Sequence, residues 1–161
     1  MIVIVMGVTG AGKTTVGRLL ASELKWEFAD ADDFHPAANV EKMRHGIALS
    51  DEDREPWLEQ LRVAIAGWID EGKNVVLACS ALKRSYRQQL DVGPGVQFVY
   101  LKGSSQLIAE RLRARAGHFA GEAILGGQFA DLEEPEDAVT VEIASAPEQI
   151  VSQIRQRLGL A

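Results

Sequence analysis

Hydrophobic residues gather in short runs that alternate with longer segments of helical spacing. Runs rich in Val and Ile predict strands over Ile2–Met6, Trp26–Ala29, Asn74–Cys79, Val96–Leu101 and Val139–Ile143. Nearly continuous apolar strands are typical of a parallel sheet whose two faces are both covered by helices. The pattern therefore predicts a single three-layer α/β domain over residues 1–161, built on five strands.

Helix signals occupy the intervals between these strands. After the first strand, hydrophobic residues recur at i, i+3, i+4 and i+8, as Val16, Leu19, Leu20 and Leu24. Ser50 and Asp53 resemble a capping box at the start of a helix that Gly72 ends. Further helices are expected over 36–43 and 81–90, after Ser104, and from 145 onward. Residues 116–128 hold four glycines and show little periodicity, so we expect a mobile segment there.

Composition and charge narrow the classes of function. Lys and Arg total 17 against 23 for Asp and Glu, and this net charge of −6 disfavours general nucleic-acid binding. Cys79 is the single cysteine, which excludes an intrachain disulfide and fits a reducing compartment. The apolar start Met1–Met6 is too short and uncharged for a signal peptide, and no apolar run approaches a membrane span. We therefore expect a cytoplasmic protein with no membrane or nucleic-acid partner.

A phosphate-binding motif stands between the first strand and the first helix. Residues Gly7–Thr14 fit the pattern of Gly, four residues, then Gly-Lys-Ser/Thr. Glycines let backbone N–H groups turn toward phosphate oxygens, and the helix N-terminus adds partial positive charge. Lys13 is expected to bridge the β- and γ-phosphates, and the Thr14 hydroxyl to ligate Mg²⁺. Motif and context together predict a nucleoside triphosphate site rather than a plain glycine-rich turn.

Several classes of protein share this motif. A GTPase switch usually carries Asn-Lys-x-Asp and Asp-x-x-Gly, and neither pattern occurs here. Motor and DNA-processing ATPases are generally larger, and the acidic balance disfavours them. A small-molecule kinase is favoured, and a nucleotide-binding regulator without an acceptor is the alternative from a different class.

Carboxylates follow the second predicted strand, at Asp30, Asp32 and Asp33. Ligands of open α/β sheets bind at the carboxyl ends of the strands, which places these groups beside the phosphate loop. One carboxylate could hold Mg²⁺ through water, and another could orient a substrate hydroxyl and accept its proton. A solvated acidic turn is the competing interpretation.

At this point the sequence resembles the gluconate kinases, in the small P-loop kinase group that includes shikimate and nucleoside monophosphate kinases. The matching segments run nearly end to end and in the family's order: Gly7–Thr14, Asp30–Pro36, Leu49–Leu58, Cys79–Lys83, Tyr100–Gly103, Gly117–Phe119 and Gln128–Phe129. The resemblance implies ATP-dependent phosphorylation of D-gluconate on its 6-hydroxyl. It also implies strand order 2-3-1-4-5, a lid over 116–128 that closes over ATP, and a homodimer. A kinase of another sugar acid or polyol remains the alternative within the class.

Gluconate is an anionic polyol, so its site needs a cation and several hydrogen-bonding groups. Arg54 is the best candidate for the carboxylate, because a guanidinium can bind it bidentately. Arg54 also matches the arginine of the family's Asp-Arg-x-Pro-Trp segment, although an ion pair with Asp51 or Asp53 is the alternative.

The resemblance implies roles for further residues on the substrate and ATP sides. The substrate side comprises Asp32, His35, Arg54, Ser80, Lys83, His118 and Gln128. The ATP side comprises Gly7, Val8, Thr9, Gly10, Ala11, Gly12, Lys13, Thr14, Thr15 and Arg111. Lys13, Asp32 and Arg115 are the expected catalytic residues, with Arg115 stabilising transition-state charge.

Alternatives stay open at several of these positions. His35 could equally hold the turn at Pro36, Lys83 could form a salt bridge on its own helix, and Arg111 and Arg115 could form a solvated basic face. No aspartate of the Walker-B kind occurs in Asn74–Cys79, so Mg²⁺ is expected on Thr14 and Asp30, with ATP and water.

Overall fold

The computed structural model describes residues 1–114 and 119–160, with side chains for 1–114 and 125–160. A five-stranded parallel sheet forms its centre, in the order β2-β3-β1-β4-β5. The strands are β1 (Ile2–Met6), β2 (Glu27–Asp30), β3 (Val75–Ala78), β4 (Val96–Lys102) and β5 (Val139–Glu142). The predicted fold class and strand order are therefore confirmed.

Alternating side chains on these strands build a core on each face of the sheet. In β1, Val3 and Val5 join one cluster, while Ile2, Ile4 and Met6 join the other. All five side chains are fully buried, so the strand shows no polar alternation in its sequence. This two-sided burial explains why a continuous apolar run predicted a central parallel strand.

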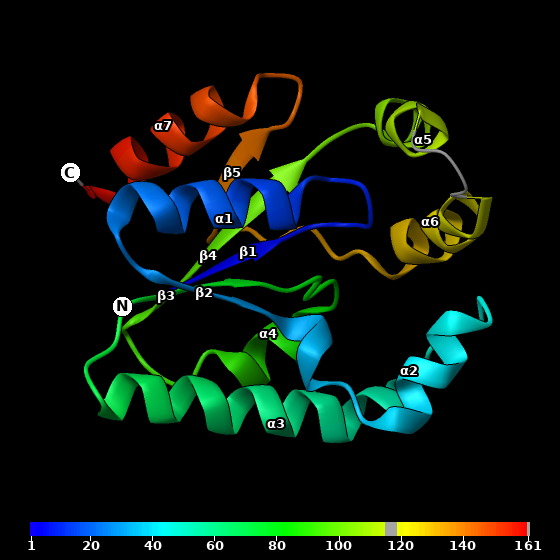
Figure 1. The fold of residues 1–161 in the computed structure, drawn as a ribbon, viewed down its shortest axis with the longest axis horizontal. Helices are drawn as coiled ribbons and strands as arrows, with labels where there is room; N and C mark the ends of the chain where they lie inside the picture. Colours follow the sequence, from blue (N-terminus) through cyan, green and yellow to red (C-terminus); the bar gives the residue numbers. More distant parts are fainter. Residues whose placement is uncertain (115–118, 161) are drawn as a thin grey trace.

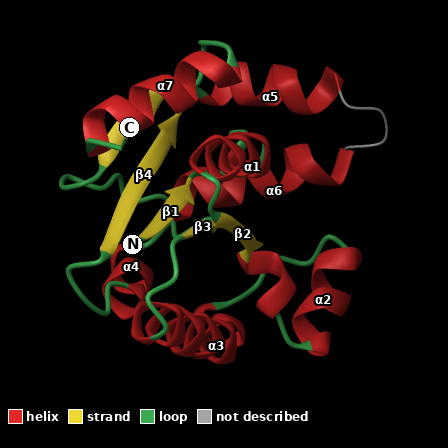
Figure 2. Ribbon diagram, turned by 60° about the vertical axis from the view of Figure 1, so that its left-hand side comes forward, coloured by secondary structure: helices red, strands yellow, loops and turns green. Residues whose placement is uncertain are grey.

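Helices cover both faces, as Figure 1 shows. The helices are α1 (Lys13–Leu24), α2 (Ala37–Arg44), α3 (Asp51–Asp70), α4 (Arg84–Leu90), α5 (Ser105–Ala114), α6 (Phe119–Asp131) and α7 (Pro147–Leu158). A 3-10 turn, η1 (Ala31–Phe34), follows β2. Helices α1 and α7 lie on one face, and α3 and α4 lie on the other. Helix α6 packs beside α5, and both lie on the same side of the molecule in Figure 1. Figure 2 shows α2 next to the end of β2 and α3.

Most of the predicted helix starts are confirmed. The Ser50 hydroxyl accepts from the Asp53 N–H, and the Asp53 carboxylate accepts from the Ser50 N–H, which completes the capping box of α3. Ser104 caps α5 through the Leu107 N–H. Helix α4 begins at Arg84 rather than at Ala81, because Ala81 has a left-handed backbone with φ of 45°.

The segment 116–128 contains a helix that its sequence pattern did not predict, whereas its role as a mobile lid stays a prediction. The part that the structure describes is helical, since α6 runs from Phe119 to Asp131. Leu125, Phe129 and Leu132 are spaced by four and three residues and pack on the core on the side of α5. A Cβ on Gly126 or Gly127 would meet open space, so the glycines lie off the packed face. In the sequence, these two glycines hid the helical spacing of Leu125, Phe129 and Leu132.

Candidate active site

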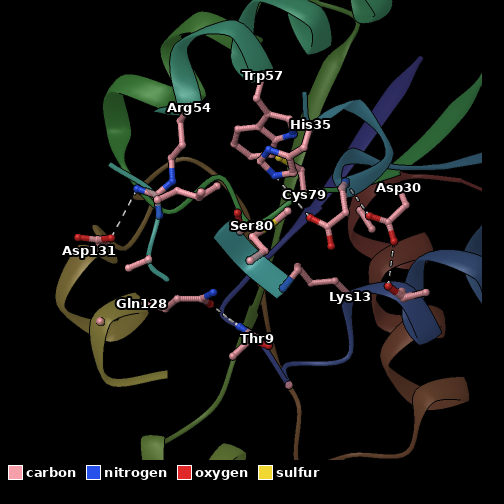
Figure 3. A pocket seen from close by; sticks show the side chains of 18 of the residues that line it. Thr9, Lys13, Asp30, His35, Arg54, Trp57, Cys79, Ser80, Gln128 and Asp131 are labelled. Carbon is pink, nitrogen blue, oxygen red and sulfur yellow. Dashed lines mark hydrogen bonds and ion pairs between the residues drawn. The ribbon is translucent and has the colours of Figure 1, made fainter. Parts of the chain in front are cut away.

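A cavity of about 390 Å³ opens at the carboxyl ends of β1, β2 and β3. Its lining includes the phosphate loop from Thr9 to Thr15, the acidic strand end, the start of α3 and the end of α6. Figure 3 shows side chains from these elements converging on one space. The cavity therefore joins the predicted phosphate site to the predicted substrate residues.

The phosphate loop owes its shape to glycines. Gly10 and Gly12 have φ values of 81° and 96°, which other residues rarely adopt. A Cβ on Gly10 would also lie 3.0 Å from side-chain atoms of Ile108 and Leu112, so α5 packs tightly against the loop. Helix α1 begins after Gly12 with no side-chain cap and no acidic residue in its first turn. Its first N–H groups are therefore left for an anion.

Lys13 lies half-buried within this loop. Its ammonium donates to the Val8 carbonyl at 3.0 Å, inside the loop itself. Burial lowers the pKa of Lys13 below its ordinary value, and the carboxylates of Asp32 and Asp30 oppose this shift. A positive charge held in this position favours the binding of phosphate oxygens.

Hard oxygen atoms for a magnesium ion lie next to the loop. The Thr14 hydroxyl is 3.4 Å from Asp30 Oδ2, and Asp30 Oδ1 accepts from the Asp32 N–H at 2.9 Å. A hydroxyl and a carboxylate match the ligand preference of Mg²⁺. Within 1–114 and 119–160, no group of three or more His, Cys, Asp or Glu could form a complete metal cage. The residues fit an ion that keeps waters and phosphate oxygens among its ligands.

Asp32 lines the same cavity. Partial desolvation by the cavity walls and the nearby Asp30 carboxylate raise the pKa of Asp32, whereas Lys13 lowers it. The Asp32 side chain is 79% exposed, so solvent screens much of the effect that the neighbouring charges have on its pKa. A carboxylate with a raised pKa is better suited to accept a proton than an ordinary aspartate.

His35 forms the wall beside Asp32. Its ring stacks on Trp57 with centroids 4.5 Å apart and an interplanar angle of 9°. His35 Nε2 lies 3.9 Å from Asp32 Oδ1, and His35 Nδ1 lies 3.2 Å from the Asn39 amide nitrogen. Desolvation, helped by the positive charge of Arg54, lowers the pKa of His35 to about 4. The ring is therefore neutral at pH 7.

The depressed pKa of His35 predicts an acid-sensitive contribution to stability. Between the ordinary value of 6.5 and the folded value of about 4, the unfolded chain binds the proton more tightly. Stability should therefore be lost as the pH falls through this window. We expect denaturant unfolding of the unaltered chain to lose about 2–3 kcal/mol more than His35→Gln between pH 7 and pH 4. Equal slopes for the unaltered chain and His35→Gln would contradict this.

Arg54 reaches the cavity from the first turns of α3. Its guanidinium donates to the Tyr86 hydroxyl at 2.9 Å, and lies 3.7 Å from Asp131 and 3.9 Å from Asp51. Tyr86 in turn donates to the Asp51 carboxylate. The Arg54 side chain is only 17% exposed, so these partners fix its direction. The alternative ion pair between Arg54 and Asp51 is therefore present only as a long contact. Arg54 makes it while also lining the cavity.

The end of α6 closes one side of the cavity. The Gln128 side-chain oxygen accepts from the Thr9 N–H of the phosphate loop at 2.6 Å. Asp131, one turn later, makes the contact with Arg54 (Figure 3). One face of this helix therefore touches both the phosphate loop and the candidate carboxylate anchor.

Other predicted residues are placed differently. Ser80 lines the cavity, but Lys83 does not, and its ammonium pairs with Asp51 at 2.8 Å. Arg111 is outside the lining and donates to the Ile143 carbonyl. Arg115 and His118 lie outside the described residues. Their expected roles on the ATP and substrate sides stay predictions.

Sequence reasoning missed several members of the site. The sequence assigns Trp57 no role in the site, although its ring stacks on His35 and lines the cavity. Asp131 gave no signal, because it belongs to no motif and meets Arg54 across 77 residues of chain. Tyr86 was not among the candidate site residues, and only the fold reveals that its hydroxyl holds Arg54.

Comparison with known proteins identifies relatives along the whole chain. The Shikimate kinase family model matches residues 9–158. A gluconokinase of Arabidopsis thaliana is 43% identical, over 98% of this chain and 92% of that protein. The thermosensitive gluconokinase of Escherichia coli (strain K12) is also 43% identical, over 95% of this chain and 84% of that protein.

A solved structure agrees with these sequences. The crystal structure of a gluconokinase from Sinorhizobium meliloti 1021 has a TM-score of 0.87 to this chain and is 40% identical. The superposition covers 98% of this chain and 90% of that one. Both the sequence and the fold carry the similarity, which spans the phosphate loop, the acidic strand end and α3. The chain belongs to the gluconokinase family, within the wider group of shikimate kinase-like P-loop kinases.

Proposed function

We propose that this chain phosphorylates D-gluconate at its 6-hydroxyl with ATP, giving 6-phospho-D-gluconate and ADP. The observation that carries the proposal is the placement of Arg54 and the phosphate loop in one cavity of a gluconokinase-family chain. Lys13 and the N-terminus of α1 supply positive charge at one end of the cavity, and Arg54 supplies positive charge at another part of it. A substrate with a carboxylate remote from its reacting hydroxyl matches this separation.

The phosphate end binds ATP through residues of the loop and of α1. The first N–H groups of α1, at Lys13, Thr14 and Thr15, would meet the phosphates, and Lys13 would leave the Val8 carbonyl to contact them. Thr14 and Asp30 would hold Mg²⁺, which neutralises phosphate charge when it is bound. Preorganised positive charge in this loop stabilises the charge that develops on the transferred group.

The acceptor end orients the hydroxyl for attack. Asp32 accepts a hydrogen bond from the 6-hydroxyl and takes its proton as the oxygen bonds to the γ-phosphorus. The bond between that phosphorus and the β,γ-bridging oxygen breaks, and ADP leaves. Arg54 holds the carboxylate of gluconate, and His35, Ser80 and Gln128 offer hydrogen-bonding groups for its other hydroxyls.

The resemblance extends the proposal beyond the cavity. Arg111 and Arg115 would act near ATP and the transferring phosphate, and His118 would contact substrate when the lid closes. Lys83 would approach the substrate only after leaving Asp51. The family also suggests a homodimer in the cytoplasm. In the described ranges, no helix is long and apolar enough to cross a membrane.

An acceptor panel tests the proposal directly. ADP release would be measured with Mg²⁺–ATP and D-gluconate, related aldonates, shikimate, glucose, AMP or no acceptor. We expect D-gluconate to stimulate release most strongly. A different best acceptor would overturn the substrate assignment and keep the kinase. Release unchanged by every acceptor, with ATP still bound, would instead support a nucleotide-binding regulator.

A further inference from the structure

Asn39 is a buried polar residue next to the cavity rather than in it. Only 3% of it is exposed, on the first turn of α2. Its amide nitrogen lies 2.8 Å from the Asp53 carbonyl oxygen, in the first turn of α3. The same nitrogen lies 3.2 Å from His35 Nδ1. Asn39 thus links α2 and α3 to the imidazole that lines the cavity.

These two contacts determine where the hydrogen of His35 lies. A peptide carbonyl can only accept, so the Asn39 atom that meets Asp53 must be the NH₂ group and not the amide oxygen. An NH₂ group has no acceptor capacity, so its second hydrogen must meet an unprotonated ring nitrogen. His35 Nδ1 is therefore the acceptor. The single ring hydrogen of the neutral imidazole is then on Nε2.

The protonated nitrogen faces the substrate space. His35 Nε2 lies 3.9 Å from Asp32 Oδ1, which is too far for a direct hydrogen bond. One oxygen atom can lie within hydrogen-bond distance of both groups. A substrate hydroxyl other than the reacting 6-hydroxyl would there accept from Nε2–H and donate to Asp32 Oδ1, which leaves the other carboxylate oxygen for the 6-hydroxyl. The parallel stack on Trp57 holds the ring plane in this direction.

We propose that Asn39 is a positioning residue, which holds His35 as its Nε2–H tautomer so that His35 and Asp32 together recognise one substrate hydroxyl. The recognition of gluconate rests on the proposed function, whereas the tautomer does not. A donor and an acceptor fixed on either side of a hydroxyl disfavour analogues without that hydroxyl, because both groups then lose their partner.

Nitrogen NMR on the full chain tests the tautomer without any substrate. In protein labelled with ¹⁵N-histidine at pH 7, we expect His35 Nδ1 to show the shift of an unprotonated nitrogen and Nε2 that of a protonated one. The chain has three histidines, and the His35→Gln spectrum assigns the signal. A hydrogen on Nδ1 in the unaltered chain would overturn the proposal, whatever any variant does.

The variant Asn39→Asp changes the partner of Nδ1 from a donor to an acceptor. We expect it to move the ring hydrogen to Nδ1 and to raise the KM for gluconate about tenfold, because one hydrogen bond to the substrate is lost. The KM for ATP should stay within about twofold. The matched control is Asn74→Asp, an exposed asparagine at the far end of β3 that accepts from the N-terminal ammonium. It should match the unaltered chain in every measurement.

Two further outcomes separate positioning from a general structural effect. Equal losses for ATP and gluconate in Asn39→Asp would overturn the proposal, since a loosened fold affects both ligands. An unchanged tautomer with an unchanged KM for gluconate would overturn it as well. If the unaltered chain does not phosphorylate gluconate, the proposed function and the hydroxyl contact fail together, and the spectrum still decides whether Asn39 sets the tautomer.

Discussion

Lys13→Ala should lower kcat by at least ~10² while the chain stays folded. The ammonium lies in the phosphate loop, where its charge meets the transferred group rather than gluconate. Much of that interaction strengthens as the bond to the leaving oxygen lengthens, so the loss appears in kcat and not only in binding. Steady-state ADP release at saturating ATP and gluconate measures it.

Lys73→Ala is the matched control for this substitution. Lys73 pairs with Glu71 and Glu27 at the opposite end of the sheet, outside the cavity lining. The substitution Lys73→Ala removes the same kind of side chain and the same charge as Lys13→Ala, and it should leave kcat unchanged. Turnover of Lys13→Ala close to that of Lys73→Ala would contradict the role given to Lys13.

Arg54→Met should raise the KM for gluconate by about 10- to 100-fold, the range expected for a lost charge-assisted pair. The substitution keeps an unbranched apolar stem and removes the guanidinium with its charge. Because the carboxylate takes no part in the transfer, ground state and transition state lose about the same interaction. The kcat should therefore change much less than the KM. Initial rates over a range of gluconate concentrations separate the two.

Arg62→Met provides the comparison on the same helix. Arg62 pairs with Glu59 on the surface of α3, two turns beyond Arg54. It should leave the KM for gluconate unaltered. A neutral polyol that is accepted as a substrate should lose little in Arg54→Met, since it offers no carboxylate. Equal losses for acidic and neutral acceptors would count against Arg54 as the anchor.

The sequence predicted the fold well because its signals are local. The run Ile2–Met6 is buried on both sides, and Ser50 with Asp53 forms a reciprocal cap within one turn of helix. Helix α6 was missed because Gly126 and Gly127, which lie off its packed face, hide the spacing of its apolar residues. Local propensity alone disfavours a helix there, and packing against the core overrides it.

The residues of the site show the same difference between local and long-range signals. Thr9 to Thr15 belong to one continuous segment, so one motif is enough to place them. The surroundings of Arg54 combine Tyr86 and Asp131 from distant parts of the chain, and only the fold brings them together. The partner of Lys83 is on another helix for the same reason, which left its two interpretations undecided in sequence.

The central claim is that the γ-phosphoryl group of ATP goes to the 6-hydroxyl of D-gluconate, and identification of the product tests it most directly. Coupled ³¹P and ¹³C NMR of a completed reaction identifies the phosphorylated carbon, and chromatography counts ADP. We predict one phosphomonoester on C6 for each ADP formed. ADP accompanied by inorganic phosphate, or a phosphomonoester on another carbon, would contradict the account.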